Sequence, residues 1–211
     1  DKYLLKYLPA FIKHLTYIKS RAGEDGLIGY GLCDWAGPFD TLEGAPTPVE
    51  FTDTILYIKC LNIAILAAEK AGNDTLLNEL SQEKNRIVHI FTREFVNEDG
   101  TSKVNEQTAI AMLIFYGIYE SLQLLKEQLK QAVEDHGFHH YCGMVGLRHL
   151  YEALNICDLQ EYAYRIITAE GHPSYSTWIK GGATTLWETW QPGNSKNHHM
   201  YSDFMALKGS T

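Results

Sequence analysis

Residues 55–68 read Ile-Leu-Tyr-Ile-Lys-Cys-Leu-Asn-Ile-Ala-Ile-Leu-Ala-Ala, and this stretch decides the fold class. Its apolar side chains fall on nearly every side of a helix, so the helix must be buried on most sides. The preceding Thr47-Pro48-Val49-Glu50 predicts where this helix begins. Thr can cap a helix, Pro suits the first helical position, and a Glu three residues after the cap completes a capping box.

The helices on either side of this segment have a different pattern. Those predicted at 2–20 and 75–95 each carry one apolar stripe and polar residues elsewhere, which is typical of a helix with one buried face. The alternation continues along the chain, with mostly apolar helices at 109–116 and 145–156 and one-sided helices at 122–133 and 159–167.

Buried helices that alternate with one-sided helices indicate two concentric layers built from helical hairpins. The sequence therefore predicts an all-α fold, an (α/α) toroid of the (α/α)6-barrel type, with an open helical solenoid as the structural alternative. Only three inner–outer pairs follow the first helix, fewer than a closed toroid needs. We therefore expect residues 1–211 to form a single domain that is the later, incomplete part of such a barrel.

Composition narrows the function classes. The net charge is −8 without a basic stripe, which argues against nucleic acid and against anionic membrane surfaces. No apolar run approaches the 18 residues of a membrane span, so no membrane partner is expected. The four cysteines form no CxxC pair, which favours free thiols over a disulfide framework or a zinc site. Such thiols favour a cytoplasmic location and leave a periplasmic or secreted one open.

Aromatic residues are abundant and concentrated near one end. There are 13 Tyr and 4 Trp, and three of the Trp fall between Trp178 and Trp190. Flat rings suit the apolar C–H faces of sugar rings, and packing in a core is the alternative use. No nucleophile elbow, phosphate-binding loop, dinucleotide fingerprint or zinc-protease motif is present, and we expect no cofactor.

One carboxylate stands in an unusual setting, the run Thr184-Thr185-Leu186-Trp187-Glu188-Thr189-Trp190. A carboxyl group flanked by two Trp is costly to desolvate, and apolar walls raise its pKa, which suits a general acid or base. Glu188 is therefore the catalytic candidate, with a structural ion pair to an Arg as the alternative. His198 and His199 further on are candidate donors to a substrate hydroxyl, and no second ligand set accompanies them, so no metal site is expected.

Two further loops interrupt the helical pattern. Asp34-Trp35 lies among glycines and is predicted to be exposed in a turn, where Asp can bind sugar hydroxyls and Trp can stack; a Trp that plugs the barrel end is the alternative. Gly143 and Gly146 flank the start of an inner helix and allow close backbone approach or tight helix packing. His139 and His140 precede them and are interpreted as surface or supporting residues.

These motifs together resemble the six-hairpin catalytic domain of the bacterial α-L-rhamnosidases, glycoside hydrolase family 78. The resemblance covers nearly the whole chain, and its most specific element is the Gly-Ala-Thr-Thr-hydrophobic-Trp-Glu run. In order, the matching elements are Asp34-Trp35, Thr47-Pro48, Gln107-Thr108, Gly143 to Gly146, Pro173-Ser174, Gly182 to Glu188 and Asn197-His198.

The resemblance implies an inverting glycosidase that acts on a rhamnose-containing glycoside or polysaccharide. In such enzymes one carboxylic acid protonates the departing oxygen while a second carboxylate activates water on the other face of the sugar. The family places the general base on Glu188. It places Trp35 and His198 in the rhamnose pocket, with Asn197 in the same motif, and Asp34 is carried over as a further binding residue.

The chain also departs from the family. The family's general acid lies in an Arg-Asp-Glu-Arg-Leu-Gly-Trp type motif, upstream of Asp34-Trp35, which this sequence lacks. We therefore expect missing upstream hairpins of the same polypeptide as a partner. The accessory β-sandwich domains usual in the family are absent, and Tyr175 replaces a Trp that is common in relatives. Asp34 is an alternative acid, if its carboxyl group lies roughly 6.5–9.5 Å from that of Glu188.

Two other functions stay open. Without the general acid of the upstream motif, the chain alone would be an inactive fragment or a sugar-binding module. Alternatively, it belongs to a six-hairpin glycosidase or lyase that acts on another sugar.

Overall fold

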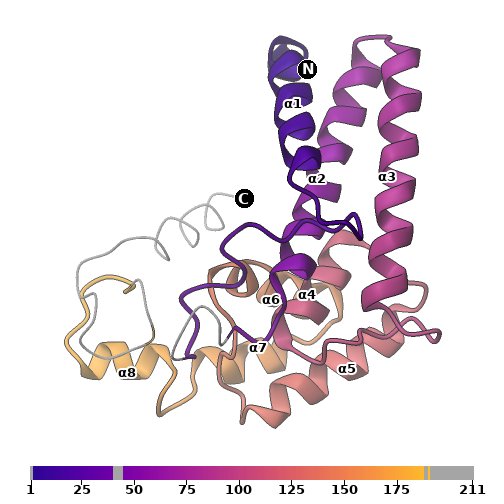
Figure 1. Cartoon of the computed structure of the whole chain (residues 1–211). Coiled ribbons are helices and arrows are strands. Elements are labelled where there is room, and N and C mark those ends of the chain that lie inside the picture. Colours follow the sequence, from indigo (N-terminus) through magenta and orange to yellow (C-terminus); the bar gives the residue numbers. More distant parts are fainter. Residues whose placement is uncertain (1, 40–44, 188–189, 191–211) are drawn as a thin grey trace. The chain divides into compact units, whose positions relative to one another are not determined.

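The computed structural model describes residues 2–39, 45–187 and 190. Within this part of the chain the secondary structure is helical, with no extended strand (Figure 1). The helices are α1 (Lys2–Ser20), α2 (Val49–Lys70), α3 (Asp74–Phe95), α4 (Gln107–Tyr116), α5 (Leu122–Asp135), α6 (Met144–Ile156), α7 (Gln160–Ile167) and α8 (Tyr175–Lys180).

The chain divides into two compact units. The first comprises residues 1–31 and 48–98 and contains α1, α2 and α3. The second comprises residues 32–47 and 99–211 and contains α4 to α8. The assignment of residues 1–211 to one domain stays a prediction.

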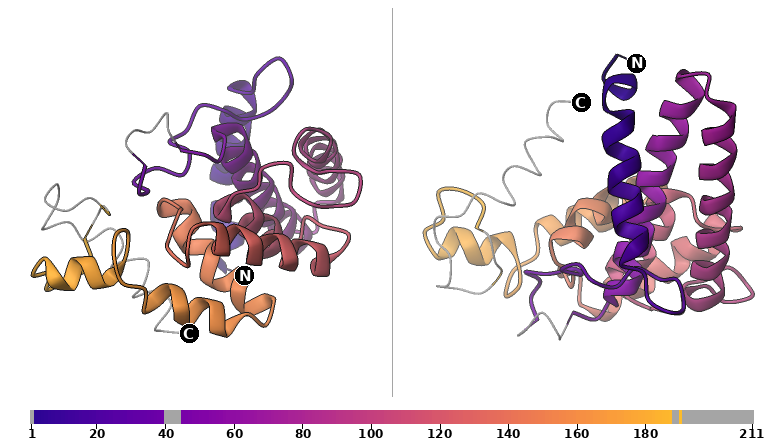
Figure 2. Two further views of the ribbon diagram at one scale, coloured as in Figure 1. Left: turned by 90° about the horizontal axis from the view of Figure 1, so that it is seen from below. Right: turned by 45° about the horizontal axis from the view of Figure 1, so that its top comes forward.

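In the first unit, α2 is the central helix and packs against both α1 and α3 (Figures 1 and 2). Ten of its side chains are buried, but Ile63 and Leu66 are 36% and 43% exposed, so the helix has an exposed strip that the apolar pattern of residues 55–68 did not predict. An aromatic cluster of Phe51, Phe91 and Phe95 joins α2 to α3, with ring centroids 5.0–5.1 Å apart. The one-sided pattern of α3 is confirmed, since Leu80, Ile87, Phe91 and Phe95 are its buried residues.

One expectation about the start of α2 was wrong. The helix begins at Val49 with Pro48 at the N-cap, and that cap has no side-chain hydrogen bond, so the expected capping box does not form. The helix is also long and apolar enough, by length and composition, to cross a membrane. Of its most apolar window, 56% is buried within the protein, which is the behaviour of a core helix.

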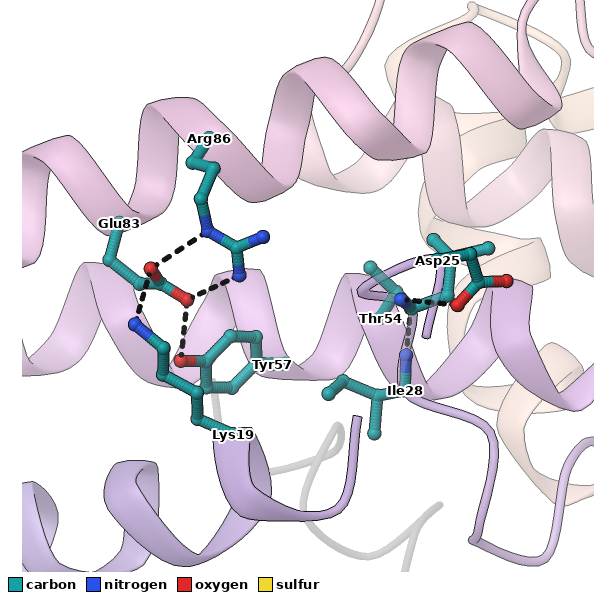
Figure 3. Close-up of polar contacts among 8 residues, drawn as sticks. Lys19, Asp25, Ile28, Thr54, Tyr57, Glu83 and Arg86 are labelled. Atoms are coloured by element: carbon teal, nitrogen blue, oxygen red, sulfur yellow. Dashed lines mark hydrogen bonds and ion pairs between the residues drawn. The ribbon is translucent and has the colours of Figure 1, made fainter. Parts of the chain in front are cut away.

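Polar contacts join the three helices of this unit (Figure 3). The Glu83 carboxylate accepts hydrogen bonds from Lys19 at 2.8 Å, from Arg86 at 2.8 and 3.0 Å and from the Tyr57 hydroxyl at 3.3 Å. Burial alone would raise the pKa of Glu83, but the bonds from Arg86 and Lys19 lower it to about 2. One carboxylate on α3 thus ties together α1, α2 and its own helix.

The segment between α1 and α2 is fixed along α2. The backbone N–H of Ile28 donates to Thr54 Oγ1 at 2.9 Å (Figure 3), and that of Gly31 donates to Asp53 Oδ2 at 2.6 Å. The path of the chain up to residue 31 is therefore set by side chains of the first two turns of α2.

In the second unit, α4 and α6 form the central pair, α5 packs on α4 and α7 packs on α6. Every residue from Gln107 to Ile114 is buried, whereas α5 buries only Leu125, Leu129, Ala132 and Val133. The predicted alternation of buried and one-sided helices is therefore confirmed in this unit too.

The short helix α8 was not predicted. Six residues are too few for a periodic pattern to show. Ser174 is the N-cap, and its Oγ accepts a hydrogen bond from the Thr177 N–H at 3.2 Å. The cap sets the start of α8 and so places Trp178, its buried residue, against the aromatic rings described below.

Candidate functional site

Asp34 lies where the N-terminal ends of α4 and α6 come together. Its Oδ2 accepts hydrogen bonds from the Thr108 hydroxyl and from the Gly143 N–H at 2.8 Å, and its Oδ1 accepts from the Gly146 N–H at 2.7 Å. Only 1% of the residue is exposed, so the expectation of an exposed Asp34 was wrong. Burial raises the pKa of the Asp34 carboxyl group, and the three hydrogen bonds oppose that increase.

Trp35 is held by the same helix end. Its backbone carbonyl accepts a hydrogen bond from the Met144 N–H at 2.9 Å, and the residue is half-buried. Gly143 and Gly146 permit this approach. A Cβ on Gly143 would lie well inside 3.0 Å of the carbonyl oxygens of Asp34 and Trp35. The expected close backbone approach is therefore confirmed at Gly143, whereas the close neighbours of Gly146 are side chains.

Gln107 fixes the segment that leads into α6. Its side-chain amide donates to the His139 carbonyl at 2.9 Å and accepts from the Tyr141 N–H at 2.9 Å, and the residue is fully buried. A buried amide whose donor and acceptor both bind backbone groups fixes those groups in place, and the sequence pattern alone does not predict these partners. Gln107 thus fixes the backbone just before α6, and the neighbouring Thr108 binds the Asp34 side chain.

A stack of aromatic rings forms the other notable feature of this unit. The centroid of the Trp190 ring lies 4.5 Å from that of the His140 ring and 4.5 Å from that of the Trp178 ring, each with an interplanar angle of 19°. Trp187 lies at the edge of the stack, 6.3 Å from Trp178. Trp187 and Trp190 are 4% and 0% exposed, so residues on both sides of Glu188 in the sequence are anchored in the interior.

His140 was interpreted as a surface or supporting residue, and the surface alternative is wrong, because it is fully buried. Its Nε2 is 2.6 Å from the Tyr151 hydroxyl, while Nδ1 has no hydrogen-bond partner among the described residues. Burial, with a smaller effect of the neighbouring His139, lowers the pKa of His140 to about 3. The imidazole is therefore neutral in the folded protein near neutral pH.

This burial predicts a specific acid sensitivity. The pKa of His140 is about 3 in the folded protein and roughly 6.5 when unfolded, so its contribution to stability is complete above pH 6.5 and is lost as the pH falls below that value. Between pH 7 and pH 5 the wild type should lose about 2 kcal/mol more than His140→Gln. Urea unfolding of both proteins at the two pH values measures the difference; a difference that does not change with pH would contradict the assignment.

A pocket of about 350 Å³ opens beside α8. Its lining joins the aromatic and apolar side chains of Tyr175, Trp178 and Ile179 to the residues of the Gly-Ala-Thr-Thr run, Ala183, Thr184, Thr185 and Leu186. Burial raises the pKa of the Tyr175 phenol. The segment that distinguishes this sequence therefore lines a concave surface with aromatic walls.

The remaining candidate residues fall elsewhere. Glu188, Asn197 and His198 lie outside the described residues, so their roles stay predictions. Within residues 2–39, 45–187 and 190, no three His, Cys, Asp or Glu side chains are grouped so as to hold a metal ion. None of the four cysteines, all of which the structure describes, forms a disulfide.

Comparison with known proteins identifies the family. The model of the bacterial α-L-rhamnosidase six-hairpin glycosidase domain matches residues 1–208. An α-L-rhamnosidase of Formosa agariphila is 27% identical over 98% of this chain and 23% of its own length, and one of Streptomyces avermitilis is 27% identical over 92% and 19%. The chain thus spans about a fifth to a quarter of these curated relatives.

Solved structures agree on the fold. The crystal structure of the Streptomyces avermitilis α-L-rhamnosidase complexed with L-rhamnose matches all of this chain and 21% of its own, at 23% identity and a TM-score of 0.83. The Dictyoglomus thermophilum α-L-rhamnosidase matches 98% of this chain and 24% of its own, at 25% identity and a TM-score of 0.83. The all-helical, six-hairpin fold class expected from the sequence is confirmed, and the chain belongs to the bacterial α-L-rhamnosidase six-hairpin glycosidase family.

Proposed function

We propose that the enzyme containing this chain hydrolyses terminal α-L-rhamnosyl residues of glycosides or polysaccharides with inversion, and that Glu188 is its general base. The observation that carries the proposal is the family match over residues 1–208. It is supported by the two buried tryptophans, Trp187 and Trp190, that anchor the chain on either side of Glu188. Such anchors restrict where a side chain between them can reach, which a general base requires.

The proposed reaction is a single displacement at the anomeric carbon by water. The Glu188 carboxylate takes a proton from water, and the water oxygen forms a bond to the anomeric carbon as the bond to the departing oxygen breaks. A carboxylic acid on the other face gives its proton to that departing oxygen. The family motif that supplies this acid is not in the chain. Both Asp34 oxygens already accept bonds from protein donors, so we do not assign Asp34 the acid role.

Sugar recognition is assigned to aromatic and polar groups. Trp35, half-buried and held at the start of α6, is proposed to stack on the rhamnose ring, whose apolar C–H face suits an indole. His198, with Asn197, is proposed to donate to substrate hydroxyls. Tyr175, which stands where relatives commonly carry Trp, gives the neighbouring pocket a smaller aromatic wall.

The stereochemistry of the product tests the mechanism. The intact enzyme is mixed with an aryl α-L-rhamnoside, and the first anomer formed is followed by proton NMR before mutarotation. Inversion predicts β-L-rhamnose first; α-L-rhamnose first would refute the single displacement. Inhibition by L-rhamnose, compared with glucuronate and glucose, separates this proposal from a six-hairpin enzyme acting on another sugar.

A second candidate function applies to the 211 residues alone. The missing acid motif and the 19–23% coverage of the curated relatives favour a module that binds sugar without cleaving it. In that case the isolated chain binds L-rhamnose, as titration calorimetry would detect, and releases no aryl product. Measurable release of that product by the isolated chain would exclude the binding-only function.

A further inference from the structure

We propose that Asp34 is a positioning residue: its carboxylate caps helix α6 from a distant part of the chain and thereby fixes Trp35 for sugar stacking. This proposal rests on the proposed function, because it takes Trp35 as the residue that meets the sugar. In this proposal Asp34 positions Trp35 and does not itself bind a sugar hydroxyl. Asp34, Trp35 and the residues that bind them all lie within the second unit.

The first turn of α6 lacks a cap of its own. The N-cap residue is Gly143, which has no side chain to accept a hydrogen bond. Helix N-terminal turns leave backbone N–H groups that need acceptors. Here the N–H groups of Gly143 and Gly146 donate to Asp34, and that of Met144 donates to the Trp35 carbonyl. The Asp34-Trp35 pair therefore provides the cap, across 109–112 residues of sequence.

A carboxylate suits this place for electrostatic reasons. The N-terminal end of a 13-residue helix carries partial positive charge, which stabilises an anion beside it. Thr108, in the first turn of α4, adds a hydroxyl donor to the same Oδ2 that accepts from Gly143. Three donors face the group, which matches an ionised carboxylate, since that form only accepts hydrogen bonds.

The carboxylate is closed off from a ligand by burial. Both oxygens accept protein hydrogen bonds, and the residue is 1% exposed. A sugar hydroxyl could reach Asp34 only after the first turn of α6 had opened. The next residue, Trp35, is only half-buried and is therefore the member of the pair that a sugar could contact.

The two glycines leave room for this geometry. A Cβ on Gly146 would collide with the Thr108 hydroxyl and with Cys142 Cβ, and would lie 3.0 Å from Asp34 Oδ2. A Cβ on Gly143 would collide with the backbone of Asp34 and Trp35. Together these contacts fix the position of the Trp35 backbone. The residues that make them are Asp34, Thr108, Gly143 and Gly146.

A double-mutant cycle in the intact enzyme tests whether Asp34 acts through Trp35. Asp34→Asn keeps the shape but turns an amide N–H toward a backbone or hydroxyl donor. We expect it to raise KM for an aryl α-L-rhamnoside about tenfold or more, with a smaller change in kcat. In a Trp35→Ala background the same change should raise KM less than about twofold, because the residue it positions is gone. Equal effects in both backgrounds would show that Asp34 meets the sugar itself and would overturn the proposal.

Thr108 offers a milder, matched pair of variants, should Asp34→Asn fold poorly. Thr108→Val removes the hydroxyl donor at constant shape and should raise KM a few-fold, roughly as expected for one hydrogen bond. Thr108→Ser restores the donor and should reverse most of that loss. If both variants raise KM equally, the hydroxyl is not part of the positioning unit and the proposal fails.

A readout independent of turnover separates this proposal from the proposed function. Acrylamide quenching of Trp35 fluorescence, taken as the difference between each protein and its Trp35→Phe counterpart, reports how well that ring is held. Asp34→Asn and Thr108→Val should both increase the quenching. An increase in an enzyme that cleaves no rhamnoside would sustain the positioning role while refuting the proposed activity; unchanged quenching in both variants would refute the positioning role.

Discussion

Glu188→Gln in the intact enzyme is expected to lower kcat for an aryl α-L-rhamnoside by about a thousandfold or more, within the range for loss of a general base. The amide has nearly the same shape as the carboxylate but cannot take a proton from water. KM should change little, because the proposed base acts on water rather than on the sugar. Steady-state kinetics with the purified variant measure both constants.

Two controls make this result specific. Glu79→Gln changes the same side chain at an exposed position of α3 and should leave turnover as in the wild type. Glu188→Ala should be partly rescued by azide, which attacks the anomeric carbon without needing a base and gives a β-rhamnosyl azide. Substantial residual turnover by Glu188→Gln would remove Glu188 from the mechanism, and an α-configured azide product would argue against inversion.

Gly143→Ala is expected to lower the free energy of unfolding by about 3 kcal/mol, near the upper end for overpacking a buried position. The new Cβ would collide with the backbone carbonyl groups of Asp34 and Trp35. Backbone atoms cannot rotate away as a flexible side chain can, so either the Asp34-Trp35 loop or the start of α6 must move. The urea midpoint of tryptophan fluorescence measures the loss, and KM for the rhamnoside should rise as the loop shifts.

Gly72→Ala is the comparison for this prediction. A Cβ on Gly72 meets nothing within 4 Å, but the residue has a φ of +63°, so the substitution costs about 1 kcal/mol of backbone strain alone. The clash at Gly143 should therefore exceed the strain at Gly72 severalfold. A loss at Gly143 that is no larger than the loss at Gly72 would mean that the loop accommodates the methyl group.

The helical framework was predictable because helical periodicity is a local property. The apolar pattern of residues 55–68 and 109–116 predicted the two helices that bury the most side chains in their units, and the one-sided pattern of 122–133 predicted a helix with one buried face. The missing cap of α2 and the short α8 were not predictable in this way. A cap depends on the geometry of one residue, and α8 is too short to show a period.

The candidate site was predictable as a set of motifs but not as a geometry. The sequence singled out Asp34 as unusual, yet it predicted exposure where the structure shows burial. The donors that surround Asp34 lie 74 to 112 residues further along the chain, and no local pattern brings them together. His140 was undervalued for the same reason, since its burial depends on Trp190, fifty residues away in sequence.

The stack of His140, Trp190 and Trp178 has an optical consequence. Two indole rings held 4.5 Å apart and tilted by 19° are close enough for their electronic transitions to couple as an exciton pair. Their circular dichroism should therefore show a paired band that disappears in Trp178→Phe or Trp190→Phe. Because Trp190 follows Glu188 by two residues, this band is an intrinsic spectroscopic gauge of order next to the proposed base. It requires neither a dye nor a substrate.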